Sequence, residues 1–167
     1  MTGYGIDRIK NTIPHRGQIL LVDRVTRVAP GESLTAIKAV SGNEPCYARL
    51  GQDAAPADYA YPTSLVIESW AQSAVLLSVW EAPNPDVLAG KVELAGSIND
   101  VTVGVRAYPG DVLEHRVRLV KAVDETAILA GATYAGGREV LRVGTFVVAL
   151  RDVGDLRPAA ERTVLNV

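Results

Sequence analysis

A run of apolar residues from Leu65 to Trp80 limits the folds open to this chain more than any other feature of the sequence. Its apolar side chains fall on nearly every side of a helix, and the run meets no helix breaker until Pro83. A helix that is apolar all round is buried, and this run is too short and too polar inside to span a bilayer. We therefore predict one long central helix, with Thr63 or Ser64 capping its first turn.

Three polar residues interrupt the apolar surface of this predicted helix. Ser64, Glu68 and Gln72 are spaced four residues apart, so they form a narrow polar stripe along one side. Burying a carboxylate is costly unless other groups satisfy it. Glu68 is therefore a candidate catalytic residue, and Gln72, one turn further on, is a candidate support that orients the site and contacts the substrate.

The rest of the chain has the pattern of β-strands. Apolar and β-branched residues alternate with polar ones between turn-forming segments, and in 112–123 the apolar and charged residues separate onto two faces. The predicted strands are 18–28, 33–40, 92–107, 112–123, 127–135 and 140–150. A long loop, 41–61, precedes the helix. These elements predict an α+β fold in which an antiparallel sheet of about six strands wraps around the helix.

Size and composition agree with a single domain. The 167 residues suffice for one core, and we take 1–167 as one domain with a C-terminal tail, 152–167, on its surface. A net charge of −2 gives no reason to expect nucleic acid, and Cys46 as the only cysteine excludes an internal disulfide. The N-terminus has no signal-peptide pattern, so we expect a soluble, cytoplasmic protein with no membrane association. No phosphate loop or metal-ligand spacing occurs, so no cofactor or metal is predicted.

Four segments, in order, resemble the 3-hydroxyacyl-(acyl carrier protein) dehydratases of the hot-dog fold. They are "IPHRGQILLVDRV", "GNEPCY", "YPTSLVIESWAQSAVLL" and "YPGDVLEHRVRLV", and the similarity covers roughly Ile9 to Leu150. The resemblance implies a hot-dog fold and a dimer, either of identical subunits or with a second hot-dog subunit. It also implies active sites at the dimer interface, each built from a histidine of one subunit and a glutamate on the helix of the other.

The resemblance assigns a reaction and a set of residues. The reaction removes water from a 3-hydroxyacyl thioester, carried by acyl carrier protein or coenzyme A, in fatty-acid or polyketide-type synthesis. Glu68 matches the family's glutamate, and backbone N–H groups near Thr63 and Ser64 are placed to hold the thioester oxygen. The candidate substrate-binding residues are Thr63, Ser64, Gln72, Tyr61, Tyr59 and Tyr47.

The sequence departs from the family at the histidine. The family places it in a G-H-F-P-G stretch after N-E-P, but no histidine lies between Asn43 and Pro62 here, and counting forward from Asn43 that position falls on Leu50. The chain has only two histidines. His15, in the opening motif, is expected to be structural, and His115, on the apolar face of a strand, is expected to be a core residue.

Three hypotheses of different functional classes remain. The chain is one subunit of a dehydratase whose histidine comes from a partner subunit, and this is the reading we favour. Alternatively, it is a stand-alone acyl thioesterase or isomerase that uses Glu68 with a loop residue such as Asp53, Asp58, Tyr59 or Tyr61. In the third hypothesis it is a non-catalytic subunit that binds acyl carrier protein or has a structural role.

Overall fold

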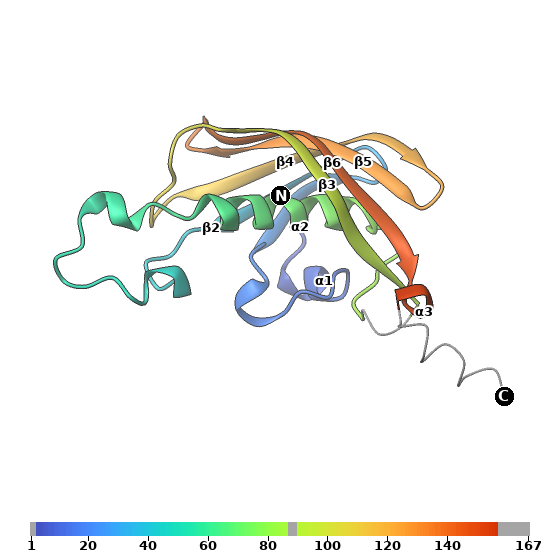
Figure 1. The fold of residues 1–167 in the computed structure, drawn as a ribbon, viewed down its shortest axis with the longest axis horizontal. Helices are drawn as coiled ribbons and strands as arrows, with labels where there is room; N and C mark the ends of the chain where they lie inside the picture. The colour runs from blue at the N-terminus through green and yellow to red at the C-terminus, as the bar shows by residue number, and fades with distance from the viewer. Residues whose placement is uncertain (1–2, 87–89, 157–167) are drawn as a thin grey trace.

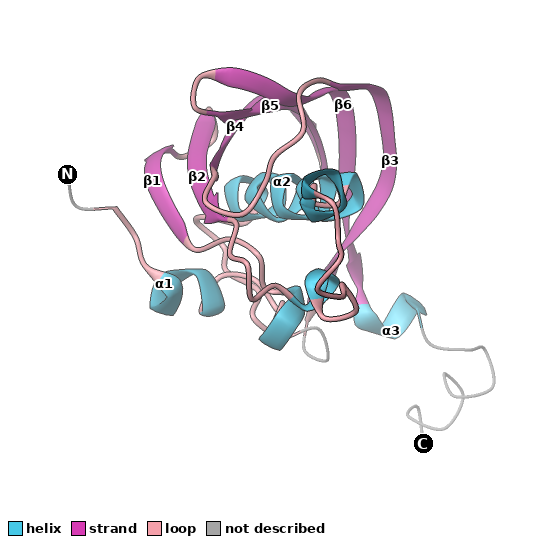
Figure 2. Ribbon diagram, turned by 90° about the vertical axis from the view of Figure 1, so that its left-hand side faces the viewer, coloured by secondary structure: helices cyan, strands magenta, loops and turns pink. Residues whose placement is uncertain are grey.

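The computed structural model describes residues 3–86 and 90–156, and the helix α2 (Thr63–Ser78) lies at its centre (Figure 1). The other elements are α1 (Ile6–Lys10), β1 (Arg24–Ala29), β2 (Ser33–Ala39), β3 (Lys91–Val103), β4 (Val112–Val123), β5 (Thr126–Ala135), β6 (Arg138–Asp152), α3 (Val153–Leu156) and three short 3-10 helices, Gly17–Ile19, Pro45–Tyr47 and Pro56–Tyr59. The strands form one sheet in the order β1-β2-β4-β5-β6-β3, and every pair is antiparallel. The sheet curves over one side of α2, while loops and α1 lie on the other side (Figure 2).

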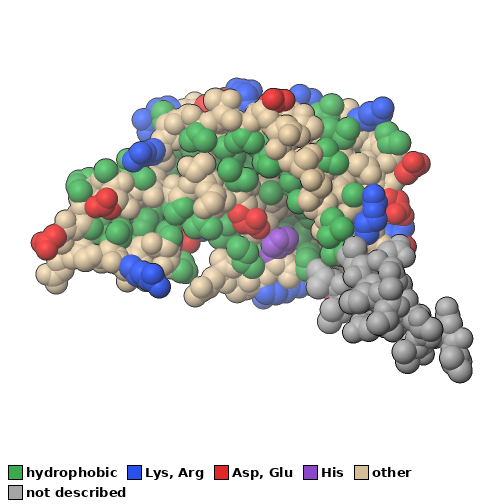
Figure 3. Space-filling view, viewed as in Figure 1, with side chains coloured by type: hydrophobic (Ala, Val, Ile, Leu, Met, Phe, Trp, Pro, Cys, Tyr) green, Lys and Arg blue, Asp and Glu red, His purple; other side chains and the backbone are tan. Residues whose placement is uncertain are grey.

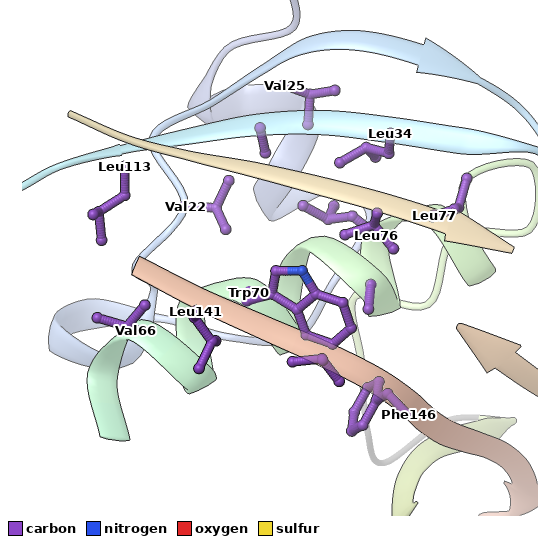
Figure 4. Close-up of a cluster of buried hydrophobic side chains, with 14 of the residues drawn as sticks. Val22, Val25, Leu34, Val66, Trp70, Leu76, Leu77, Leu113, Leu141 and Phe146 are labelled. Carbon is purple, nitrogen blue, oxygen red and sulfur yellow. The ribbon is translucent and has the colours of Figure 1, made fainter. Parts of the chain in front are cut away.

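The core forms where α2 meets the concave face of the sheet. Trp70, at the middle of the helix, is fully buried, and its ring meets that of Phe146 edge-on with 5.8 Å between centroids (Figure 4). The Trp70 indole N–H also donates to the backbone carbonyl of Arg116 on β4, at 3.4 Å. Leu76 and Leu141 are fully buried in the same cluster. This burial explains why so apolar a helix is stable in this fold.

The central helix and most of the strands are where the sequence predicts them. Strand β4 has the predicted bounds, and β5 and β6 differ from theirs by at most two residues. The predicted strand 18–28 is wrong in its first half, because β1 begins only at Arg24 and Gly17–Ile19 is a 3-10 turn. The segment before β1 is apolar for another reason: Leu21 and Val22 are buried against the core without pairing as a strand.

The predicted cap of the helix is also wrong. Pro62 occupies the N-cap position, and no side chain caps the first turn. Thr63 and Ser64 are the first helical residues, one and two positions too late for their hydroxyls to serve as N-cap acceptors, and both side chains are exposed. The start of α2 is therefore uncapped by any side chain and exposed within this chain.

The expected core position of His115 is confirmed. Its side chain is fully buried on β4, and its Nδ1 lies 2.8 Å from the hydroxyl of Thr133 on β5. Burial lowers the pKa of His115 to about 3, and the positive charge of Lys38 contributes in the same direction. Lys38 is itself buried on β2, at 6% exposed, where its Nζ contacts Glu44 Oε1 at 2.5 Å.

Most of the predicted C-terminal tail, 152–167, lies outside the described residues. Of its first residues, Asp152 ends β6 and Val153–Leu156 forms a short helix. Among the described residues, no helix is long and apolar enough to cross a membrane.

The buried His115 predicts a loss of stability in acid. Its pKa is about 6.5 when unfolded and lower in the folded chain, so the unfolded state binds the extra proton and stability falls as the pH drops below 6.5. The loss attributable to this group approaches about 1.4 kcal/mol per pH unit. Urea unfolding of wild type and His115→Asn at several pH values between neutral and mildly acidic measures it. The variant keeps a side chain that can bond Thr133, and we expect it to show a shallower slope; parallel slopes contradict the prediction.

Candidate active site

Glu68 lies on a side of α2 that is only partly covered. Its side chain is 35% exposed, so it is not buried within this chain as the sequence suggested. One turn further along the helix, the Gln72 amide donates a hydrogen bond to Glu68 Oε1 at 2.7 Å. The predicted polar stripe is therefore real, and its two inner members contact each other directly.

Gln72 also joins the helix to the segment before β1. Its side chain is buried, and its Oε1 accepts a hydrogen bond from the Leu21 backbone N–H at 3.0 Å. Its Nε2 donates to the carbonyl of Ile19 at 2.6 Å as well as to Glu68. Because both ends of the amide are held, Gln72 fixes the position of the Glu68 carboxylate, as expected of a supporting residue.

His15 is the residue that sequence reasoning missed. It was expected to be structural, but the structure places its Nε2 3.6 Å from Glu68 Oε1. That separation is too long for a hydrogen bond, and the pair is ionic only when the imidazole is protonated. The Nδ1 atom of His15 is buried without a hydrogen-bond partner among the described residues, and burial lowers the pKa of the imidazole against the opposing effect of Glu68. His15 is therefore a neutral ring beside the carboxylate at neutral pH.

A cavity of about 260 Å³ opens beside these residues. Its walls come from the segment before the 3-10 helix Gly17–Ile19, from α2, and from β3 and β6. The lining residues are Pro14, His15, Glu68, Ala71, Gln72, Val75, Val92, Glu93, Ala95 and Phe146. Figure 3 shows a histidine and a carboxylate side by side on this face, with hydrophobic side chains around them. A mostly apolar pocket with a few convergent polar groups is the usual form of a small-molecule site.

The three candidate tyrosines lie elsewhere. Tyr47 and Tyr61 are buried in the core cluster, and the rings of Tyr47 and Tyr59 are 5.9 Å apart. Burial raises the pKa of Tyr47 to about 12 and raises that of Tyr61 as well. None of the three lines the cavity at Glu68, so within this chain they do not form one site with it. Their predicted role in substrate binding stays a prediction.

Thr63 and Ser64 stand at the open end of the same helix. The first N–H groups of a helix have no acceptor within it, and the helix dipole favours negative charge there. Ser64 precedes Glu68 by about one turn, so the two share a side of α2. Among the described residues, no group of three or more His, Cys, Asp or Glu side chains could hold a metal ion.

Comparison with known proteins identifies the family. Residues 13–144 match the family model of the FabA-like domain. The chain belongs to this FabA-like family. Two curated relatives of this FabA-like chain are 3-hydroxyacyl-(acyl-carrier-protein) dehydratases FabZ. That of Clostridium kluyveri is 32% identical over 136 residues, covering 81% of this chain and 89% of the relative. That of Symbiobacterium thermophilum is 34% identical over 147 residues, covering 88% of this chain and 97% of the relative.

Solved structures confirm the hot-dog fold of the FabA-like chain. A chain of the dehydratase heterocomplex ApeI:P from Xenorhabdus doucetiae superposes with a TM-score of 0.65 at 17% identity, over 95% of this chain and 97% of that one. A hot-dog-like protein from Thermanaerovibrio acidaminovorans gives 0.59 at 16% identity, over 83% and 94%. The six-stranded antiparallel sheet around one long helix is thus the predicted hot-dog architecture.

The contacts of Gln72 predict that it stabilises both the fold and the site. We expect Gln72→Leu to lower the free energy of unfolding by about 1–3 kcal/mol, because the buried N–H of Leu21 loses its acceptor. Chemical denaturation measures the change. Ser78→Ala is the matched control on the same helix, because the Ser78 hydroxyl bonds only within its own turn, to the carbonyl of Val75. Equal losses in the two variants would show that the bridge to Leu21 contributes nothing.

Proposed function

We propose that this chain is one subunit of a dehydratase that removes water from 3-hydroxyacyl thioesters carried by an acyl carrier protein. Glu68 delivers a proton to the departing C3 hydroxyl, and a histidine of a second hot-dog subunit takes the proton from C2. The electrons of the C2–H bond then form the double bond as the C3–O bond breaks. The observation that carries this proposal is Glu68, held by Gln72 on the wall of the cavity.

The placement of Glu68 suits acid–base chemistry on an acyl thioester. The carboxylate is fixed by one hydrogen bond, which leaves its other oxygen for a substrate. Apolar side chains such as Val75 and Phe146 line the same cavity and offer a surface for an acyl chain. The free N–H groups at the start of α2, near Thr63 and Ser64, supply donors for the thioester oxygen as charge develops on it.

We expect the second subunit to pair with strand β3, at the edge of the sheet. This strand is the last strand of the sheet, and among the described residues it pairs on one side only, with β6. Leu94, Val101 and Val103 on β3 are large apolar residues that are exposed. A long edge strand with exposed apolar side chains is a template for pairing with another chain. A subunit added here would bring its own residues close to the cavity, since β3 forms one of its walls.

A partner subunit also explains the missing histidine. No histidine lies between Asn43 and Pro62, the segment in which the resemblance places the family's histidine. A site shared between two subunits can lose this residue from one chain when the other chain retains it. The neighbour from Xenorhabdus doucetiae is itself a dehydratase heterocomplex, which is the kind of assembly proposed here.

His15 offers a second source for the proton acceptor, within the same chain. Its imidazole is 3.6 Å from Glu68 and lines the cavity, and its lowered pKa leaves it neutral and able to accept a proton. In that case the chain would act without a histidine-bearing partner. Activity of the chain alone would assign the proton acceptor to His15, and activity only with a partner would assign it to the partner's histidine.

The proposed function predicts that Glu68→Gln abolishes dehydration and largely preserves substrate binding. The test uses this chain co-purified with a hot-dog subunit that carries G-H-F-P-G, and a 3-hydroxyacyl-(acyl carrier protein) substrate. We expect kcat to fall by about 100-fold or more, the usual contribution of a general acid or base, with little change in KM. Glu32→Gln, an exposed carboxylate in the turn between β1 and β2, is the control and should retain full activity.

The same assay separates the competing hypotheses. Undiminished turnover by the Glu68→Gln pair rejects the proposed function. Dehydration by the purified chain alone, abolished by His15→Gln, assigns the acceptor to His15 and removes the need for a partner. Hydrolysis or isomerisation of acyl thioesters by the chain alone supports the thioesterase or isomerase hypothesis. Saturable binding of acyl carrier protein without turnover in any assembly supports a non-catalytic subunit.

A further inference from the structure

A second carboxyl group, that of Glu93 on β3, lines the cavity that holds Glu68. The two groups come from different elements, the edge strand and the central helix, so they reach the cavity from different walls. Glu93 has no part in the reaction proposed above. Its presence in an acyl cavity therefore calls for a separate explanation.

The surroundings of Glu93 leave part of its hydrogen-bonding capacity unused. Its Oε1 is buried and has no hydrogen-bond partner among the described residues, although the Asn84 side chain bonds to the carboxyl group. No lysine or arginine is among the described residues that line the cavity. A buried polar atom without a partner costs free energy, and such atoms in folded proteins are usually completed by a ligand, a water or a partner.

The chemistry of the group indicates what would complete it. Burial raises the pKa of Glu93, against the opposing effect of hydrogen bonds from its own backbone N–H and from Asn84. The unpartnered Oε1 can accept a hydrogen bond. A hydroxyl group on the bound chain offers an O–H donor to that oxygen. A plain alkyl chain offers no donor, and would leave Oε1 desolvated and without a partner.

We propose that Glu93 is a specificity-determining residue that selects acyl groups bearing a hydroxyl beyond C3 over plain alkyl chains. The proposal rests on the proposed function, because it takes the cavity at Glu68 as the acyl site. It adds that the cavity is tuned for oxygenated chains. The remaining apolar walls, including Val75, Val92 and Phe146, contact the carbon skeleton in either case.

Equilibrium binding tests this selection independently of catalysis. The probes are saturated octanoyl pantetheine and its counterparts with one hydroxyl on one of the last three carbons. Calorimetry with the full-length chain should show at least one hydroxylated thioester binding about 10-fold more tightly than the plain one, as expected for one completed hydrogen bond in a buried site. Glu93→Leu should reverse that preference, and Glu93→Gln should retain part of it.

Controls and outcomes keep this test separate from the dehydratase assay. Glu114→Leu, on the outer face of β4, removes a carboxylate that pairs with Arg116 outside the cavity and should leave both affinities unchanged. Equal binding of plain and hydroxylated thioesters by wild type, or no binding of any, overturns the proposal even if Glu93→Leu does not fold. A hydroxyl preference without any dehydration refutes the proposed function and leaves the selection by Glu93 intact. Dehydration without a preference for hydroxylated thioesters supports the proposed function and refutes the selection by Glu93.

Discussion

The burial of α2 is the constraint on which the rest of this structure depends. The helix is apolar on almost every side, so it needs cover all round, and a flat sheet can cover only one face of it. The sheet meets this need by curving, and Trp70 fills the space between the helix and β6 through its contact with Phe146. On the remaining side, the segment before β1 covers the helix, and buried Gln72 holds that segment through the backbone of Ile19 and Leu21.

The site is a consequence of the same arrangement. Where the sheet and the covering segment do not meet, a cavity remains along α2, and Glu68 and Gln72 of the polar stripe line it. Glu68 lies on that stripe, and Gln72 serves both the fold and the carboxylate with a single amide. Any change that loosens the segment before β1 therefore also displaces the Glu68 carboxylate. Stability and site geometry are coupled here through one side chain.

The parts of the structure that sequence predicts are those set by local pattern. The alternation in β4 and the uniform apolarity of α2 fixed those two elements closely, because neither depends on a distant residue. Glu68 and Gln72 were found from a spacing along one helix. His15 and Glu93 were not predicted as site residues, because they line the cavity only through the way a loop and an edge strand are placed around α2. The ion pair of Lys38 with Glu44 was not predicted for the same reason, because Glu44 belongs to the following loop.

That loop bears on how the missing histidine should be understood. If the segment 41–61 had merely degenerated, its conformation would have little support from the core. Instead, Lys38 and Glu44 form an ion pair with both side chains largely buried, and breaking such a pair typically costs about 3–5 kcal/mol. Tyr47 and Tyr61 are buried in the core, and Leu50, the position counted for the histidine, packs against it. A loop held this firmly has kept a structural role without an imidazole, as the proposed shared site requires.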